Sequence, residues 1–245
     1  MKYVFERERK NYSALASGAV LYSLPGTTAF PIRLISELFQ YVYLLRQQRG
    51  IGKERITIFD PCCGSAYHLA ALGFLHPDKI EKIICSDIDE DVLAVARKNL
   101  SLLSAKGMVE RIAELVAMYA KYKKASHQQA LVSAQKLKKS ITNSLTTVCQ
   151  QDNIFNTTAF ENLKNESIDI VFADIPYGNM VNWQGVKTGK DEVWLLLENL
   201  LKNINSKTMT VIASNKKQIV EHERYARIKQ IKVGKRKITI LGCAK

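Results

Sequence analysis

The sequence predicts an α/β fold with a mostly parallel sheet, because strand-like and helix-like segments alternate along the chain. The strand-like segments are short and rich in β-branched residues, and they occupy residues 55–60, 82–87, 168–175 and 208–215. Helical patterns of apolar residues occupy residues 65–76, 89–103 and 191–204. Such alternation is typical of βαβ units, which bind ligands at the carboxyl ends of their parallel strands. Three of the four strands have an aspartate at their last position or one residue before it, so we expect the ligand site at that edge.

An N-terminal helix is expected before the first strand, within residues 24–50. This stretch has a Pro-Gly turn, a proline suited to the first helical turn, apolar residues at helical spacing and a closing Gly50. We therefore expect a helix that packs on the domain.

The first strand leads into a turn of small residues, FDPCCGSA at residues 59–66. A strand that ends in Asp60, followed by a turn and a helix N-terminus, lets a cofactor lie against exposed backbone N–H groups. Only Gly64 is a glycine, so the dinucleotide fingerprint is incomplete, and no lysine follows for a phosphate-binding loop. The turn therefore favours a cofactor without a pyrophosphate group.

The second strand ends at Asp87, in the sequence CSDID. A carboxylate at this position can accept hydrogen bonds from both ribose hydroxyls of an adenosine cofactor. Many strands end in a surface aspartate, so Asp87 indicates a cofactor site only in combination with the turn after the first strand.

Residues 104–148 do not fit a βαβ crossover. They contain no strand-like segment, are rich in Ala, Lys and Gln, and hold two stretches with apolar residues at helical spacing. We expect an inserted helical pair within a single domain that spans residues 1–245. Two roles stay open for this insertion, a packing hairpin and a substrate-gripping arm.

The loop ADIPYG at residues 173–178 carries the most specific chemistry. It resembles the (D/N)-P-P-(Y/F) loop of amino-group methyltransferases, with isoleucine in place of the first proline. Asp174 can accept a hydrogen bond from a target N–H, the carbonyl of Pro176 can accept another, and Tyr177 offers a ring on which an extruded base can stack. An ordinary proline turn is the alternative.

The C-terminal segments 226–234 and 236–244 are strand-like and are joined by a short Gly-Lys turn. This spacing predicts an antiparallel hairpin that closes the parallel sheet.

The net charge of +13 is unevenly distributed. Lys and Arg exceed Asp and Glu by 5 in residues 1–55, by 6 in 104–148 and by 10 in 202–245, whereas residues 56–103 and 149–201 carry −3 and −5. Basic blocks beside acidic ones favour a polyanion held next to a neutral or cationic ligand. A solubilising surface charge is the alternative.

Several classes of protein are disfavoured. No run of eighteen apolar residues is present and the N-terminus is charged, so we expect a soluble, cytoplasmic protein without a signal peptide or a membrane span. Five cysteines without a Cys-x-x-Cys pair and four scattered histidines support neither a disulfide framework nor a metal site.

Together these motifs resemble the AviRa family of rRNA methyltransferases, which are class I enzymes with a Rossmann-like fold. The likeness rests on DPCCGSAYHLAALGFLH, SDIDEDVLAVARKNLSLLS, ADIPYGNMVNWQG and the helix AFPIRLISELFQ, and it extends through VIASNKKQI. It implies S-adenosylmethionine as cofactor and a guanine of large-subunit rRNA, at N1 or the exocyclic amine, as the target. Antibiotic resistance is the biological role that the family implies, and we expect a monomer.

The resemblance also implies roles for individual residues. Asp152 would meet the adenine amino group. The expected cofactor residues are Asp60, Cys62, Gly64, Ser65, Asp87, Ile88, Asp152 and Asn153. Asp174, Pro176 and Tyr177 would form the base pocket. From its place after this loop, Trp183 is expected as a second stacking wall, or alternatively as a loop anchor. From the charge pattern, Lys121, Lys123 and Lys124 are the expected RNA contacts if the insertion grips the substrate.

Two other functions remain open at this stage. Related loops occur in DNA amino-methyltransferases and protein glutamine methyltransferases, although no separate target-recognition region is visible. An RNA-binding protein on a degenerate methyltransferase fold is disfavoured, because such a protein would have no reason to keep Asp60, Asp87, Asp174 and Tyr177 together.

Overall fold

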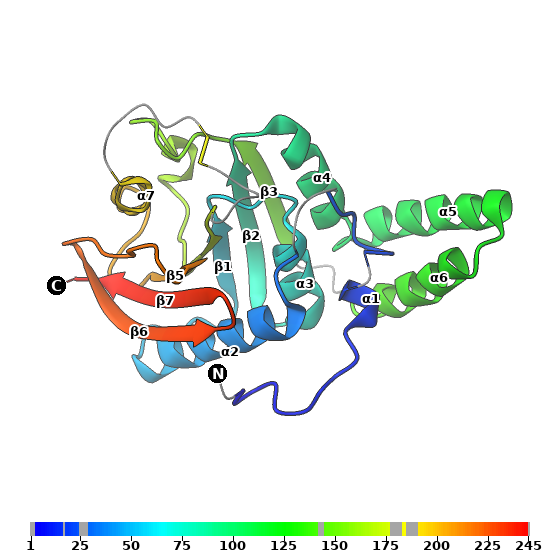
Figure 1. The fold of residues 1–245 in the computed structure, drawn as a ribbon, viewed down its shortest axis with the longest axis horizontal. Coiled ribbons are helices and arrows are strands. Elements are labelled where there is room, and N and C mark those ends of the chain that lie inside the picture. Colours follow the sequence, from blue (N-terminus) through cyan, green and yellow to red (C-terminus); the bar gives the residue numbers. More distant parts are fainter. Residues whose placement is uncertain are drawn as a thin grey trace.

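The computed structural model of the chain describes residues 3–16, 18–24, 29–141, 145–176, 183–184 and 191–244. A seven-stranded sheet with the strand order β3-β2-β1-β4-β5-β7-β6 forms the centre of the protein (Figure 1). Five strands are parallel, and the last two form the expected antiparallel hairpin. The predicted mixed α/β class is therefore confirmed.

The parallel strands are β1 (Ile56–Asp60), β2 (Ile80–Asp87), β3 (Thr146–Gln151), β4 (Ile170–Asp174) and β5 (Met209–Asn215). Four of these match segments expected from the sequence. The fifth, β3, begins inside the range 104–148, which was wrongly expected to be free of strands. It is an edge strand whose residues are half-buried or exposed, so its sequence TTVCQQ lacks the continuous apolar run of a central strand.

The two faces of the sheet have separate cores. One apolar cluster packs α2 (Ile32–Gln48), α3 (Tyr67–Leu75) and α4 (Glu90–Ser101) against one face. The other contains residues of the 3-10 helix η1 (Glu161–Leu163) and of α7 (Glu192–Leu200). This division follows from the right-handed crossovers, because the chain moves outward from β1 in both directions.

The expected N-terminal helix is α2, which follows Pro31 and ends just before Gly50. Its buried Arg46 pairs with Asp169, the residue that precedes β4, and so fixes the helix to the sheet. The chain before α2 is held by Glu37, whose carboxylate accepts three backbone N–H groups of residues 4–6 at 2.7–2.9 Å.

The hairpin consists of β6 (Tyr225–Val233) and β7 (Arg236–Cys243). Strand β7 pairs with β5 in antiparallel register, with Asn215 opposite Arg236. The β6–β7 turn therefore lies at the carboxyl end of β5, at the same edge of the sheet as the other parallel strand ends.

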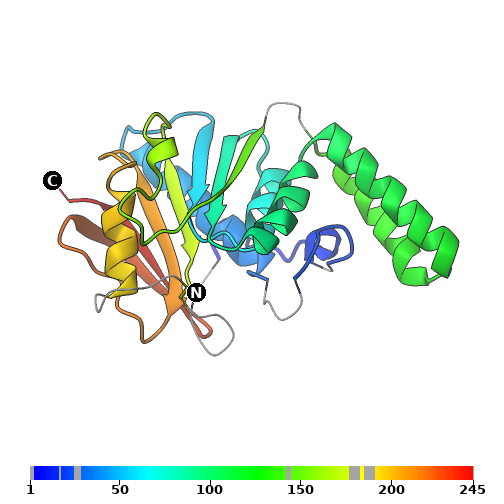
Figure 2. The ribbon, with the colours of Figure 1, turned by 90° about the horizontal axis from the view of Figure 1, so that it is seen from above.

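The inserted helical pair is α5 (Ala105–Tyr122) and α6 (Ala125–Lys138), which we call the arm. It extends away from the sheet, beyond the β3 side, in both views (Figures 1 and 2). With 18 residues in α5, the arm reaches about 27 Å from its base. A short helix, α1 (Ser13–Ala16), contacts α6.

Two features fix the arm where it leaves the domain. Gly107 lies so close to the end of α4 that an added Cβ would be 2.1 Å from the backbone oxygen of Ser101. Arg111 is buried and donates to the carbonyl oxygens of Ala19 and Val20 at 3.0 and 2.9 Å. The arm base is therefore packed rather than hinged. No helix in the described ranges is long and apolar enough to cross a membrane.

Candidate functional site

The strand order reverses direction between β1 and β4, which places a topological switch point at the carboxyl ends of these strands. Open α/β sheets bind ligands in the crevice outside this point, because the loops that follow β1 and β4 run to opposite faces. The predicted FDPCCGSA turn follows β1, and the ADIPYG loop follows β4. The two motifs with the strongest chemical signals are thus brought together.

The turn after β1 is closed by backbone hydrogen bonds. Cys63 donates to the carbonyl of Ser86 at 2.9 Å, and Ala66 donates to the carbonyl of Cys63 at 2.9 Å. Gly64 and Ala66 both have left-handed backbone conformations, with φ of 54° and 51°. Ala66 thus adopts a positive φ that glycine would adopt without strain, and its Cβ does not prevent the turn.

Asp60 lies beneath this turn and is fully buried. One carboxylate oxygen accepts the N–H of Cys62 at 2.9 Å, and the other lies 2.7 Å from Nε2 of the buried His68. Both oxygens have partners inside the protein, and the side chain has no exposed surface through which a ligand could reach it. Asp60 therefore shapes the turn, and a cofactor would sense it only through the turn.

Asp87 is half-buried beside the turn. Its Oδ2 accepts the N–H of Gly64 at 2.9 Å and its Oδ1 accepts the N–H of Asp89 at 3.2 Å. Burial raises the pKa of the Asp87 carboxyl above its ordinary value, while the hydrogen bond from Gly64 opposes that rise. Each carboxylate oxygen can accept a further hydrogen bond, so Asp87 can still receive the hydroxyls of a ribose.

The segment after β3 completes this side of the site. Asp152 donates its backbone N–H to the carbonyl of Asp87 at 3.0 Å, and its carboxylate accepts the N–H of Phe160 at 2.8 Å. Asn153 forms a local turn by accepting the N–H of Phe155. The carbonyl of Ile88 accepts a hydrogen bond from the side chain of Gln151 at 2.9 Å. The residues predicted to hold ribose and adenine therefore lie next to one another.

The loop after β4 is described as far as Pro176. Ile175 donates to the carbonyl of Ala213 at 3.1 Å, so the strand pairing continues one residue beyond Asp174. The carbonyl of Pro176 accepts a hydrogen bond from Nε2 of Gln218 at 3.0 Å. Tyr177, the expected stacking residue, lies outside the described residues.

Cys62 shows that the site is strongly acidic. Burial raises the pKa of its thiol well above the ordinary value, and the charges of Asp60, Asp87 and Asp174 raise it further. The thiol therefore stays protonated, so it is unsuited to act as a nucleophile. Three carboxylates around one side chain also produce a negative potential that favours a cationic ligand.

The predicted substrate residues do not lie together, because the three lysines are on the arm and Trp183 is beside the segment that follows β3. Lys121, Lys123 and Lys124 are exposed at the far end of the arm, so they can contact only a large ligand. The ring of Trp183 packs edge-to-face against Phe155, with centroids 5.5 Å apart. This contact agrees with the loop-anchor alternative for Trp183.

Two residues at the site were not predicted from the sequence. Gln218 supports the loop after β4, as described above. Asn99 of α4 is fully buried and donates to the carbonyl of Ser65 at 2.8 Å and to that of Tyr22 at 2.9 Å. The available signal for Asn99 was an amide on the apolar stripe of an amphipathic helix, beside Leu100.

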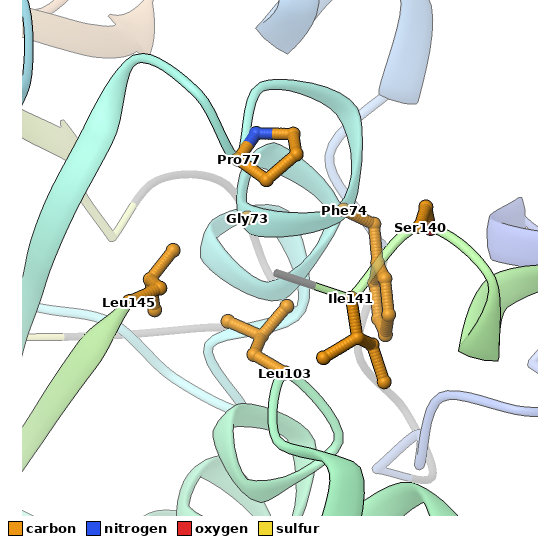
Figure 3. Close-up of a pocket in the computed structure, with 7 residues that line it drawn as sticks. All are labelled: Gly73, Phe74, Pro77, Leu103, Ser140, Ile141 and Leu145. Carbon is orange, nitrogen blue, oxygen red and sulfur yellow. The ribbon is translucent and has the colours of Figure 1, made fainter. Parts of the chain in front are cut away.

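A small hollow lies elsewhere, at the amino ends of β2 and β3 (Figure 3). Its lining residues come from the end of α3, the α3–β2 loop, the α4–α5 connection and the segment between α6 and β3, and they are Gly73, Phe74, Pro77, Leu103, Ser140, Ile141 and Leu145. This apolar hollow is at the opposite edge of the sheet from the strand-end residues and has no part in the site.

Comparison with known proteins gives the family. The family model described as "rRNA methyltransferase AviRa" matches residues 1–236. The chain belongs to the AviRa family of rRNA methyltransferases. A curated relative from Streptomyces viridochromogenes, 23S rRNA (guanine(2535)-N(1))-methyltransferase, is 32% identical over 97% of this chain and 94% of its own length.

Solved structures agree with this assignment. Two structures of the rRNA methyltransferase AviRa from the same organism superpose with TM-scores of 0.86 and 0.87 and are 31% and 32% identical. They match 98% and 99% of this chain and 96% of theirs. The resemblance expected from the motifs is therefore confirmed, as is the Rossmann-like methyltransferase fold. A protein of the AviRa family is an enzyme that methylates rRNA, which excludes the non-enzymatic alternative.

Proposed function

We propose that this protein transfers the methyl group of S-adenosylmethionine to N1 of a guanine in 23S rRNA. The observation that carries the proposal is the match over nearly the whole chain to a relative named for that reaction. The arrangement of strand ends described above supplies the chemistry that the reaction requires. An enzyme with this substrate would work in the cytoplasm.

The turn and the strand ends fit S-adenosylmethionine. Gly64 faces open space, since an added Cβ there would meet no atom within 4 Å, so a ligand can approach the backbone. Asp87 would accept the ribose hydroxyls and Asp152 would accept the adenine amino group. The cofactor supplies an activated methyl group on a positively charged sulfur.

The acidic surroundings favour the reactant form of the cofactor. Asp87 and Asp174 both lie close enough to Cys62 to affect its pKa, so their charges also act on a ligand at the turn. Transfer of the methyl group removes the positive charge from the sulfur. A negative site would therefore hold the cationic cofactor more strongly than its neutral-sulfur product as far as this charge term is concerned.

Asp174 would accept a hydrogen bond from the N1–H group of guanine. Methyl transfer forms a bond from N1 to the methyl carbon, breaks the carbon–sulfur bond and leaves one proton to be removed from N1. A carboxylate at the end of β4 is placed to hold that N–H and to take the proton, directly or through water. Positioning of the two reactants would provide most of the rate.

The arm would hold RNA at a distance from the pocket. Its tip combines Lys121, Lys123 and Lys124 with the rings of Tyr119 and Tyr122, and each of these lysines lies 5.1–5.9 Å from a tyrosine ring centroid. Basic side chains beside aromatic rings suit phosphates and unstacked bases.

The test is to incubate the protein with isotope-labelled S-adenosylmethionine and 23S rRNA, then to locate the label by mass spectrometry of nuclease fragments. We expect one labelled guanine, identified as 1-methylguanosine after digestion to nucleosides. Label on an exocyclic amine, on another base or on DNA under the same conditions would contradict the proposal.

A further inference from the structure

We infer that the carboxyl end of β5 and the β6–β7 turn form a second RNA-binding surface, which holds backbone phosphates next to the target nucleotide. We call this surface the β5 rim, and it consists of Lys216, Lys217 and Lys235. The inference rests on the proposed function for the identity of the RNA, and it concerns residues far from the arm.

The sheet register places the rim beside the site. Lys216 and Lys217 directly follow β5, which is the neighbour of β4. Lys235 lies in the β6–β7 turn, and the register brings that turn back to the end of β5 because Arg236 is opposite Asn215. All three lysines therefore lie at the edge where β4 ends in Asp174.

The rim is tied to the loop that would hold the base. Gln218 donates through Nε2 to the carbonyl of Pro176 at 3.0 Å and accepts the N–H of Asn215 through Oε1 at 2.9 Å. The backbone carbonyl of Gln218 accepts a hydrogen bond from the buried ammonium group of Lys237. The segment that carries Lys216 and Lys217 is thus held on both sides, so its backbone keeps a defined position relative to Pro176.

The charges of the rim are not neutralised by the protein. Lys216, Lys217 and Lys235 are exposed, and their ammonium groups form no ion pair within the described residues. The sequence has no acidic residue in 202–220 or in 224–245. Uncompensated cations beside an acidic site are suited to the phosphates on either side of a base that would bind there.

A simpler explanation of surface lysines applies to β6 but not to the rim. Lysines on an edge strand prevent pairing with other chains, and Lys229 and Lys232 lie on β6, which is an edge of this sheet. Lys216 and Lys217 lie in a connection and Lys235 in a turn, so none of them protects an open strand edge.

The rim and the arm are separate surfaces. The arm leaves the domain beyond the β3 side, and the hairpin that contributes Lys235 forms the other end of the sheet (Figure 2). The end of β5 is four strand spacings from β3, which is about 19 Å, and the arm extends outward beyond β3. The rim and the arm would therefore contact different parts of the RNA.

The experiment compares two variants with equal charge. The rim variant is K216Q/K217Q/K235Q. The control variant is K53Q/K164Q/K207Q, which removes three exposed lysines that precede β1, follow η1 and precede β5. Binding to a transcript of the 23S rRNA segment that holds the guanine modified in the Streptomyces relative is measured at several salt concentrations.

We expect the rim variant to lose about tenfold or more in affinity near 0.1 M salt. The slope of log affinity against log salt concentration should be less negative by about two to three for this variant, which is the change expected for three lost phosphate contacts. The control variant should keep the wild-type slope. Calorimetry should give unchanged S-adenosylmethionine affinity for both variants. Equal losses in the two variants, or no loss in the rim variant, would overturn the inference.

A single-turnover assay separates this inference from the proposed function. At saturating RNA, we expect the rim variant to methylate more slowly than the wild type, because the phosphates beside the target nucleotide are no longer fixed. If the wild-type protein methylates no rRNA, the proposed function fails. If the wild type methylates and the rim variant matches it in rate and affinity, only the rim assignment fails.

Discussion

Replacing Asn99 by leucine should remove the connection between the arm base and the cofactor turn. Asn99 accepts the N–H of Tyr22 at 2.7 Å and donates to the carbonyls of Tyr22 and Ser65. The hydroxyl of Tyr22 in turn donates to Glu114 of α5 at 2.7 Å. A single buried amide thus joins Ser65 of the cofactor turn to the segment on which the arm rests.

The expected cost follows from the groups left without partners. Leucine has a similar volume but no polar atoms, so three backbone groups lose their hydrogen bonds. Leaving a buried polar group without a partner costs about 1–3 kcal/mol, and we expect about 1–2 kcal/mol for each of these groups because Tyr22 and Ser65 are only half-buried. The free energy of unfolding should therefore fall by about 3–6 kcal/mol. We also expect weaker binding of S-adenosylmethionine, because the carbonyl of Ser65 is no longer oriented.

Urea unfolding measures the first effect and calorimetry the second. Asn203 provides the control, since it is also buried but its amide has no hydrogen-bond partner among the described residues. Asn203→Leu should leave stability unchanged or raise it, because no hydrogen bond is lost. A loss of less than about 1 kcal/mol for Asn99→Leu, or equal losses for both variants, would refute the reasoning.

Three further perturbations have distinct expected outcomes. Asp87→Ala should weaken S-adenosylmethionine binding by about 1–3 kcal/mol in calorimetry, because two ribose hydroxyls lose a charged acceptor; unchanged affinity in the folded variant would remove Asp87 from the site. Burial, and next the charge of Lys79, lowers the pKa of His76 to about 4. In the unfolded chain His76 takes up a proton below pH 6.5, whereas in the folded protein it does so only near pH 4. The free energy of unfolding therefore falls as pH decreases from 6.5 to about 4, by up to about 3 kcal/mol in total. Urea unfolding at several pH values should show this slope in the wild type but not in His76→Phe, and equal slopes would contradict it. Gly107→Ala should destabilise the protein by about 1–3 kcal/mol, because its Cβ would meet the oxygen of Ser101; an unchanged melting temperature would show that the arm base can shift freely.

The parts of the fold that the sequence predicted are those with strong local signals. The central strands are continuous β-branched runs, and the helices around them have apolar stripes, so their positions follow from periodicity. Strand β3 was missed because an edge strand needs no apolar run, and TTVCQQ resembles the polar end of the insertion. The direction of the arm was also beyond prediction, since it depends on the close approach of Gly107 to Ser101.

The site shows the same division between local and long-range information. Asp87, Asp152 and Asp174 follow strands, and parallel strands bring their carboxyl ends together, so their proximity could be predicted. The partners of the two Asp60 oxygens could not be predicted, because one of them is the buried His68, eight residues later in the chain. Gln218 was missed for a similar reason, since its partner Pro176 is 42 residues away in the chain.

The central claim is that the loop after β4 holds the target base while the turn after β1 and the end of β2 hold the cofactor. Single-turnover methylation of 23S rRNA by Asp174→Ala, with calorimetry of S-adenosylmethionine on the same preparation, tests it most directly. The account predicts a rate about tenfold to a thousandfold below wild type with little change in cofactor affinity. A folded variant that methylates at nearly the wild-type rate would contradict the account and place the base pocket elsewhere.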